Sequence, residues 1–334
     1  MIEASLAKIN VTDIRVVTFA NFKKNYRGIY DFIICDEIQD STKSLLELMK
    51  QRAKRVIVGG DSNQSIYQEL DNEPTLKQEE ILKILSIDSS ETDQRFHQLT
   101  IIHRLSKYVI KGISSFLPEM KILAAKTSMI KKHKPIYLWR CLDNKDEVKR
   151  IMTEAKKALN NGESVAILFQ FHNQIEKFIN IYLQTLELPL FDFAKNQFNG
   201  KPNYSELNNY LEKNNVKLQS ITNGAGTLVS DAHKIIISTY HSSKGLDFKN
   251  VYLPFCNYSA KFPDDNSDET KEFKRLFMVA MTRSWENLFI SYTGNMNICI
   301  QKFYNDKQAC AFTDYKDVSK QQDHFPEPSD DDDW

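Results

Sequence analysis

The sequence has no long apolar run, little glycine and few cysteines. No apolar stretch approaches the roughly 18 residues that cross a bilayer, and Met1–Ser5 gives no basic start before an apolar segment. We therefore expect neither a membrane span nor a signal peptide. With 10 glycines, long flexible linkers are not expected. The five cysteines are an odd number, scattered and without a Cys-x-x-Cys pair, which argues against a disulfide framework or zinc ribbon and favours a reducing cytoplasm.

The composition is that of a soluble protein with real cores. Hydrophobic residues make up 41% and charged residues 26% of 334 residues, which suits two domains or one large one and excludes disorder of the whole chain. The zero net charge conceals an asymmetry, because residues 311–334 carry eight acidic and two basic side chains, a net charge of −6. The remainder is therefore +6, a balance compatible with nucleic-acid binding but weak as a signal by itself.

Short apolar runs of strand length alternate with segments of helical spacing, and no internal repeat is visible. The predicted strands are Ile14–Phe19, Tyr30–Cys35, Arg55–Val58, Leu99–Ile102, Ile136–Trp139, Val165–Phe169, Ile235–Thr239, Val251–Phe255 and Leu288–Tyr292. The predicted helices include Thr42–Gln51, Leu105–Phe116, Asp146–Leu159, Asn173–Leu183 and Glu269–Met281. This alternation predicts an α/β protein with a parallel sheet covered on both faces.

Three polar stretches interrupt the pattern. Asp71–Arg95, with one helical stretch, can connect two sheet systems. Lys195–Asp231 has the composition of an insertion with one short helix, and the tail after about residue 311 has no apolar periodicity and is predicted to be disordered.

Two predicted strands end in polar side chains. Asp36 and Glu37 directly follow the first, where an Asp can hold Mg²⁺ and a Glu can polarise water, although a helix-capping acid is about equally expected from this segment alone. Asp61 and Gln64 follow Gly60 after the second strand, and can contact a phosphate or water or form a simple glycine turn.

Two later segments have similar potential. Lys244 and Gly245 lie in a hydroxyl-rich loop after the strand Ile235–Thr239, where an anion can bind. Arg283 ends a helix just before another strand, and an arginine there either stabilises charge on a transferring phosphoryl group or simply solvates the helix.

Taken together and in this order, the segments resemble superfamily 1 DNA helicases of the UvrD/Rep type. The matches are Asp36–Asp40 (motif II, DExQD), Gly60–Tyr67 (motif III), Leu99–Ser106 (motif IV), Thr239–Phe248 (motif V), Arg275–Arg283 (motif VI), Val165–Leu183 and, weakly, Thr18–Phe22 in motif Ic. The resemblance covers roughly residues 14–294. The occurrence of all these motifs in the family's order outweighs the purely structural explanations given above for each segment.

The resemblance implies a role for each matching position. At the ATP site, Asp36 holds Mg²⁺, Glu37 activates water and Gln64 senses the γ-phosphate. Arg104 and Arg283 contact that phosphate. Gly245 lies by the phosphates, and Asp247, where the family has Glu, faces the ribose. Phe22, Tyr67 and His241 lie near single-stranded DNA or couple it to the nucleotide.

The sequence also departs from the family. It contains no G-x-x-x-x-G-K-[ST], the Walker A loop whose backbone N–H groups and lysine cradle the β- and γ-phosphates. The tryptophan that usually follows motif III is absent, since Gln68, Glu69 and Leu70 come after Tyr67. We expect the first sheet to lack its central strand and to leave backbone groups unpaired.

The resemblance therefore implies RecA-like P-loop NTPase folds: an incomplete first domain (1–98), a complete second domain (99–310) with a small insertion near 195–231, and an acidic tail (311–334). The expected function is the C-terminal portion of an ATP-dependent, 3′–5′ DNA helicase, a hydrolase in DNA repair. Its ATPase would work only with Walker A supplied by another polypeptide. The alternatives are a catalytically inactive DNA-binding or interaction protein and a decayed reading frame.

Overall fold

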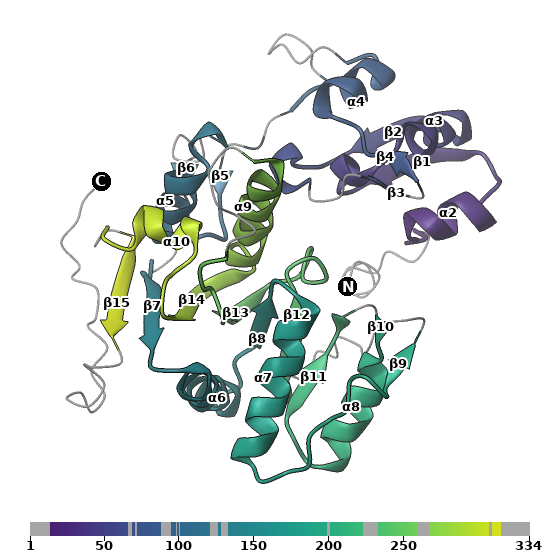
Figure 1. The fold of residues 1–334 in the computed structure, drawn as a ribbon. Helices are drawn as coiled ribbons and strands as arrows, with labels where there is room; N and C mark the ends of the chain where they lie inside the picture. Colours follow the sequence, from purple (N-terminus) through teal and green to yellow (C-terminus); the bar gives the residue numbers. More distant parts are fainter. Residues whose placement is uncertain are drawn as a thin grey trace. The chain divides into compact units, whose positions relative to one another are not determined.

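The computed structural model describes residues 14–65, 69–70, 72–87, 95–97, 99, 101–120, 126–127, 133–198, 201–222, 233–259, 267–306 and 309–314. The chain divides into two compact units, residues 1–98 and 99–334 (Figure 1). None of the helices in the described ranges is long and apolar enough to cross a bilayer.

In the described part of the first unit, three α-helices accompany a small parallel sheet. Its elements are α2 (Phe19–Asn25), β1 (Tyr30–Cys35), η1 (Ile38–Asp40), α3 (Lys43–Arg52), β2 (Ala53–Val58), η2 (Ser62–Gln64), β3 (Glu69–Leu70), β4 (Glu73–Pro74) and α4 (Gln78–Leu85). Helix α3 begins where the Thr42 hydroxyl accepts the backbone N–H of Leu45, and its apolar face buries Leu45, Leu46 and Met49.

The sheet of the first unit has one covered face and one bare face. Strands β1 and β2 are paired in parallel, with Ile34 opposite Ile57. Alternate residues, including Cys35 and Val58, face the core against α3. On the opposite face Phe32, Ile34 and Ile57 are 53%, 69% and 51% exposed. Such a face is unusual for a parallel sheet, whose two faces are ordinarily covered.

The second unit is built on a seven-stranded parallel sheet with the strand order β11-β12-β8-β13-β14-β7-β15. The strands are β7 (Ile136–Cys141), β8 (Val165–Phe169), β11 (Leu218–Ser220), β12 (Ile235–Thr239), β13 (Phe248–Leu253), β14 (Ser284–Thr293) and β15 (Cys310–Asp314). The short pairs β5 (Ile101–Ile102) with β6 (Lys126–Thr127), and β9 (Gln197–Phe198) with β10 (Lys201–Pro202), lie outside this sheet.

Helices cover both faces of the large sheet. They are α5 (Lys107–Phe116), α6 (Asn144–Asn160), α7 (His172–Thr185), α8 (Tyr204–Lys213), α9 (Asp268–Met281) and α10 (Ile298–Phe303), with the short η3 (Pro118–Met120) after α5. Helices α6, α7 and α8 contribute to one large core, while α5 packs against α9 and α10 (Figure 1). All five residues of β8 are buried, as the continuous apolar run predicts, and the predicted α/β fold with a parallel sheet is confirmed.

Three predictions of local structure are corrected. Residues 14–18 form no strand: Thr18 caps α2, which begins at Phe19, because an apolar run becomes a strand only where a neighbouring strand pairs with it. The predicted insertion 195–231 is partly integral to the second unit, since α8 buries Tyr204, Leu207 and Leu211 and β11 joins the main sheet. Residues 311–314, predicted to be disordered tail, belong to β15, which pairs with β7.

The segment before β12 is polar, so its composition did not indicate that α8 and β11 pack into the second unit. Asn208 on α8 replaces a missing strand neighbour: its side-chain amide donates to the Ser220 carbonyl at 2.8 Å and accepts the Ser220 N–H at 2.7 Å. The rest of the predicted acidic tail, residues 315–334, lies outside the described residues.

Candidate nucleotide and DNA sites

The acidic residues of the first unit lie where its two parallel strands end. Parallel strands bring their carboxyl ends to one sheet edge, where ligands of such folds bind. The loops after β1 and β2 are joined there, because Gly59 N–H donates to the Cys35 carbonyl at 2.9 Å and Ile38 N–H donates to the Gly59 carbonyl at 3.0 Å. The predicted motif II and motif III residues therefore share one edge.

Gln39 connects these two loops. Its buried side-chain amide donates to Glu37 Oε2, and its Oε1 accepts the backbone N–H of Asp61 at 3.0 Å. A Cβ at Gly60 would lie 2.3 Å from Gln39 Oε1 and 2.9 Å from Ile38 Cγ2, so glycine lets the two loops approach without a shift of Gln39 or Ile38. Sequence reasoning gave Gln39 no role, although its place between two acids in the DExQD box could have indicated one.

Glu37 has an uncommon backbone conformation for a residue with a side chain. Its φ of +54° lies in the left-handed region, where non-glycine residues are strained. Its N–H donates to Asp36 Oδ1 at 2.9 Å, and Asp36 itself is exposed. The sharp turn thus presents two successive carboxylates at the sheet edge, and Gln64 Nε2 donates to Asp61 Oδ2 at 3.1 Å beside them.

The donor set at this edge fits a magnesium ion carried with a nucleotide. Within the described ranges no group of three or more His, Cys, Asp or Glu residues gathers as a metal cluster. Mg²⁺ keeps several waters and is commonly bound through one or two carboxylates together with substrate phosphates. The exposed carboxylate of Asp36 is suited to such a role, with the phosphates supplying further oxygens.

In the second unit, the loop after β12 is closed by its own side chains. Thr239 Oγ1 accepts the Ser242 N–H at 3.2 Å, and Ser243 Oγ donates to the Tyr240 carbonyl at 2.8 Å. Gly245 has a φ of +79°, so the loop reverses where glycine is favoured. Two predicted nucleotide contacts are brought together here: Arg104 Nη1 lies 3.7 Å from Asp247 Oδ2, a half-exposed ion pair.

Arg283 is held inside the second unit. It is 2% exposed, and its guanidinium donates to the carbonyls of Val279 (2.9 Å) and Leu246 (3.2 Å) and to Thr282 Oγ1 (2.9 Å). This set ties the end of α9 to the loop that contains Gly245. A γ-phosphate contact by this arginine therefore requires the buried guanidinium to become accessible from outside the second unit.

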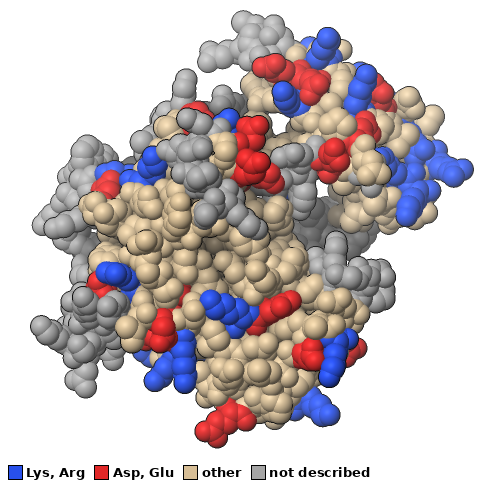
Figure 2. All heavy atoms as spheres, viewed as in Figure 1, with Lys and Arg blue, Asp and Glu red and all other residues tan. Residues whose placement is uncertain are grey.

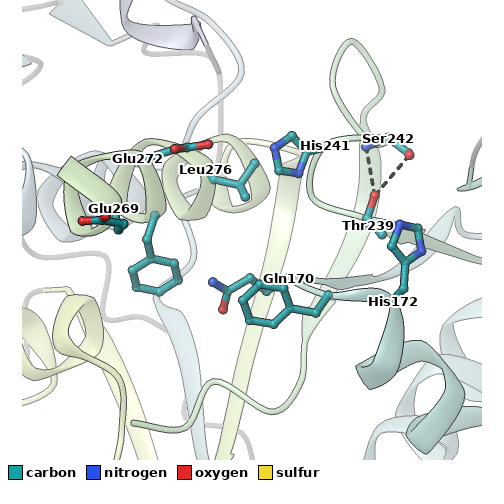
Figure 3. Close-up of a pocket in the computed structure, with 10 residues that line it drawn as sticks. Gln170, His172, Thr239, His241, Ser242, Glu269, Glu272 and Leu276 are labelled. Atoms are coloured by element: carbon teal, nitrogen blue, oxygen red, sulfur yellow. Dashed lines mark hydrogen bonds between the residues drawn. The ribbon is translucent and has the colours of Figure 1, made fainter. Parts of the chain in front are cut away.

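A pocket of about 410 Å³ opens beside the same loop (Figure 3). It lies beyond the ends of β8 and β12 and against α9. The lining residues are Gln170, Phe171, His172, Thr239, His241, Ser242, Glu269, Glu272, Phe273 and Leu276. The set combines aromatic and imidazole rings with amide, hydroxyl and carboxylate groups, which suits a flat, partly polar ligand such as a nucleobase.

Two histidines of the pocket are fixed differently. His172 Nδ1 is 2.7 Å from the Tyr204 hydroxyl of α8, which orients that ring. Burial lowers the pKa of His241, opposed by the carboxylate of Glu272. His241 is therefore a neutral ring at neutral pH, so it can stack or hydrogen-bond but brings no positive charge. The structure places this predicted DNA-contact residue in a pocket wall.

The other two predicted DNA contacts have different outcomes. Phe22 is a core residue at 8% exposure, with the Arg52 guanidinium 5.7 Å from the centroid of its ring, so direct stacking on a DNA base would require the ring to leave the core. The other predicted role of Phe22, to couple DNA to the nucleotide site, stays a prediction. The apolar pattern of α2 places Phe22 inward, where burial of the ring stabilises the first unit. Tyr67 lies outside the described residues.

Comparisons with known proteins agree with the motifs. Residues 7–80 match the UvrD/REP helicase N-terminal domain, and residues 190–295 match the UvrD-like helicase C-terminal domain. "Putative ATP-dependent DNA helicase YjcD" of Bacillus subtilis (strain 168) is 37% identical over 75 residues, which cover 20% of this chain and 10% of that protein. The chain thus aligns with about a tenth of this relative.

A solved structure is also similar at low identity. The C-terminal domain of a possible DNA helicase from Lactobacillus plantarum superposes with a TM-score of 0.39 and 11% identity, over 64% of this chain and 98% of that one. The family assignment depends instead on the two domain models. They describe the N-terminal and the C-terminal domain of UvrD-like helicases, and together they match more than half of the chain. The chain belongs to the UvrD/Rep-type helicase family.

Proposed function

We propose that this chain supplies the catalytic and DNA-contacting part of an ATP-driven helicase whose Walker A loop is contributed by another polypeptide. The observation that carries the proposal is the intact hydrogen-bonded edge formed by Glu37, Gln39, Asp61 and Gln64. A left-handed glutamate and a glycine at a close approach of two loops are features typical of functional sites. The sequence nevertheless has no G-x-x-x-x-G-K-[ST].

The chemistry assigned to this edge is the transfer of the γ-phosphoryl group of ATP to water. Asp36 would hold the magnesium ion, which neutralises charge on the phosphates when bound. Glu37 accepts the proton of the attacking water, and Gln64 orients that water. Arg104 and Arg283 stabilise the charge on the transferring group, and the bond to the β-phosphate oxygen breaks to release ADP. Translocation along one strand, in the 3′–5′ direction by family resemblance, belongs to the same proposal.

The bare sheet face supports completion by another polypeptide. Phe32, Ile34 and Ile57 form an apolar surface on strands that lead directly to the acidic edge. An incoming segment that covers this face would bury these side chains at roughly 25 cal/mol per Å² of apolar area. It would also be positioned to bring a phosphate loop toward Asp36 and Glu37.

Replacing an isoleucine on this face should impair assembly with the second polypeptide without destabilising the fold of this chain. We expect Ile34→Asp to change the free energy of unfolding of the isolated chain by no more than about 0.5 kcal/mol, because the side chain is exposed. The same change should abolish ATPase reconstitution with a polypeptide that carries Walker A. The matched control is Ile29→Asp, an equally exposed isoleucine that precedes β1. Normal reconstitution by Ile34→Asp would contradict docking on this face.

The pocket beside His241 supports a DNA-contacting role for the second unit. Rings from Phe171, His172, His241 and Phe273 border it, and aromatic surfaces accept any base by stacking. On the face shown in Figure 2, basic and acidic side chains are interspersed. Two acids, Glu269 and Glu272, line the pocket, so affinity there is expected to depend mainly on base stacking.

Single-strand binding should be weak, salt-dependent and sensitive to His241. Counterion release predicts that affinity for a labelled oligonucleotide falls as salt rises. His241→Ala should weaken binding by about fivefold or more, which corresponds to the ~1 kcal/mol lower limit for loss of one stacking contact. His233→Ala is the control, because His233 is an exposed histidine of the same unit outside the pocket. Equal affinities of the two variants would remove the pocket from the DNA path.

A second candidate function is a helicase-derived protein that binds DNA without hydrolysing ATP. The burial of Arg283, whose guanidinium donates to three acceptors within the second unit, favours this candidate. The two candidates differ in phosphate release by the chain mixed with a Walker A polypeptide, single-stranded DNA and Mg²⁺. Turnover supports the first, and silence with every such polypeptide supports the second.

A further inference from the structure

The turn after β13 is held by a carboxylate from a distant part of the chain. Phe255 in this turn has a φ of +57°, a region that a bulky residue rarely occupies. Its N–H donates at 2.8 Å to Oε1 of Glu147, which lies on the first turn of α6. The unfavourable backbone conformation is thus paired with a specific side-chain acceptor.

Burial of an ionisable side chain such as that of Glu147 costs free energy of folding. Glu147 is fully buried, its Oε1 also accepts the Ser291 hydroxyl at 2.6 Å, and its Oε2 has no hydrogen-bond partner in the described part of the chain. Burial raises the pKa of Glu147 to about 7, against the hydrogen bonds from Ser291 and Phe255, which lower it. Because an apolar residue is often at least as stabilising in such a place, stability alone does not account for the acid.

The turn held by Glu147 leads to the wall of the pocket. The Phe255 carbonyl accepts from Gln174 Nε2 at 3.5 Å, and Gln174 Oε1 accepts the N–H groups of Gln170 (3.0 Å) and Phe171 (3.1 Å). Gln170, labelled in Figure 3, and Phe171 both line the pocket.

A second contact runs beside this hydrogen-bonded chain. The Phe255 ring lies 6.3 Å from the ring of Phe169, centroid to centroid. Phe169 is the last residue of β8 and immediately precedes Gln170, and its carbonyl accepts the Tyr240 N–H at 2.8 Å. Tyr240 in turn precedes His241, so the turn at Phe255 is linked through Phe169 to both loops that border the pocket.

We propose that Glu147 is a positioning residue for the pocket: its carboxylate fixes the turn at Phe255, and this turn fixes the backbone of Gln170 and Phe171 through Gln174. The inference depends on the proposed function only in taking single-stranded DNA as the ligand of the pocket. Glu147 itself touches no ligand and acts through two intervening residues.

The test compares two near-isosteric replacements by hydrogen exchange of individual amides. Glu147→Met removes the acceptor, and we expect the N–H groups of Phe255, Gln170 and Phe171 to exchange about tenfold faster, as for the loss of one hydrogen bond. Oligonucleotide affinity should fall several-fold in parallel. Glu147→Gln keeps an acceptor and avoids burying an ionisable group, so exchange and affinity should both stay as in the unaltered chain.

Ser291→Ala provides the matched control. It removes the other donor to Glu147 Oε1 without touching the turn, so it should destabilise the second unit and leave Gln170 and Phe171 protected. Unchanged protection of these two amides in Glu147→Met would overturn the proposal. Equal loosening by Ser291→Ala would also overturn it, because general destabilisation would then explain the effect.

If Glu147→Met does not fold, a second variant tests the next contact in the series, the hydrogen bonds from Gln170 and Phe171 to Gln174. Gln174→Met should loosen Gln170 and Phe171 while Phe255 N–H stays protected by Glu147. Loosening of all three amides alike, or of none, would overturn the proposed order. The exchange measurement needs no DNA, so a chain that fails to bind oligonucleotides would refute the proposed DNA role while still testing the positioning role.

Discussion

Phosphate release by the reconstituted enzyme should nearly stop when Glu37 is replaced by Gln. Glutamine can still accept the hydrogen bond from Gln39, so the turn at the sheet edge keeps its geometry. It cannot take the proton of the attacking water, and loss of a general base typically slows turnover by about 10²–10⁴-fold. The measurement is phosphate release with single-stranded DNA and Mg²⁺, together with nucleotide binding, which should be largely retained.

Glu79→Gln is the control for this variant, since Glu79 is an exposed acid in the first turn of α4. The chain without a Walker A polypeptide should release little or no phosphate, because nothing in its sequence matches the loop that grips the phosphates. Robust turnover by this chain alone, abolished by Glu37→Gln, would show that phosphate binding is provided in another way and that no second polypeptide is needed.

Replacement of Arg283 by Ala should slow the reconstituted ATPase by about 10³-fold or more, as for loss of a charge-stabilising arginine in phosphoryl transfer. The buried guanidinium also ties α9 to the loop of Leu246, so some loss of stability is expected too. Each acceptor left unpaired costs about 1–3 kcal/mol. Thermal unfolding must therefore be measured beside the rate, with Arg275→Ala, an exposed arginine of the same helix, as control.

The two measurements together decide what Arg283 does. A fall in rate that far exceeds the loss of folded protein assigns the arginine to the reaction. A fall in rate that only follows the folded fraction means that the guanidinium stays on its three internal acceptors, as a structural tie. The latter outcome would strengthen the candidate that binds DNA without hydrolysis.

The alternation of strands and helices was readable from the sequence because burial on both faces leaves a continuous apolar run. Strands β8 and β12 coincide with the runs Val165–Phe169 and Ile235–Thr239. The edge strands were missed or misplaced for the opposite reason: β11 and β15 are short and partly polar, and only their pairing with β12 and β7 makes them strands. Residues 14–18 show the converse, an apolar run without a partner.

The sequence by itself also determined the family, because ordered motifs name residue types at fixed positions in the chain. The sequence could not show whether those residues are buried, exposed or hydrogen-bonded. Packing decided that Phe22 is core, that Arg283 is internally bonded and that Gln39 joins Glu37 to Asp61. The link from Glu147 to Phe255 joins residues 108 apart, and such contacts exist only once the strands are aligned in the sheet. Local pattern indicates the central strands and the helices, whereas edge strands and side-chain partners depend on which segments the tertiary structure brings within hydrogen-bonding distance.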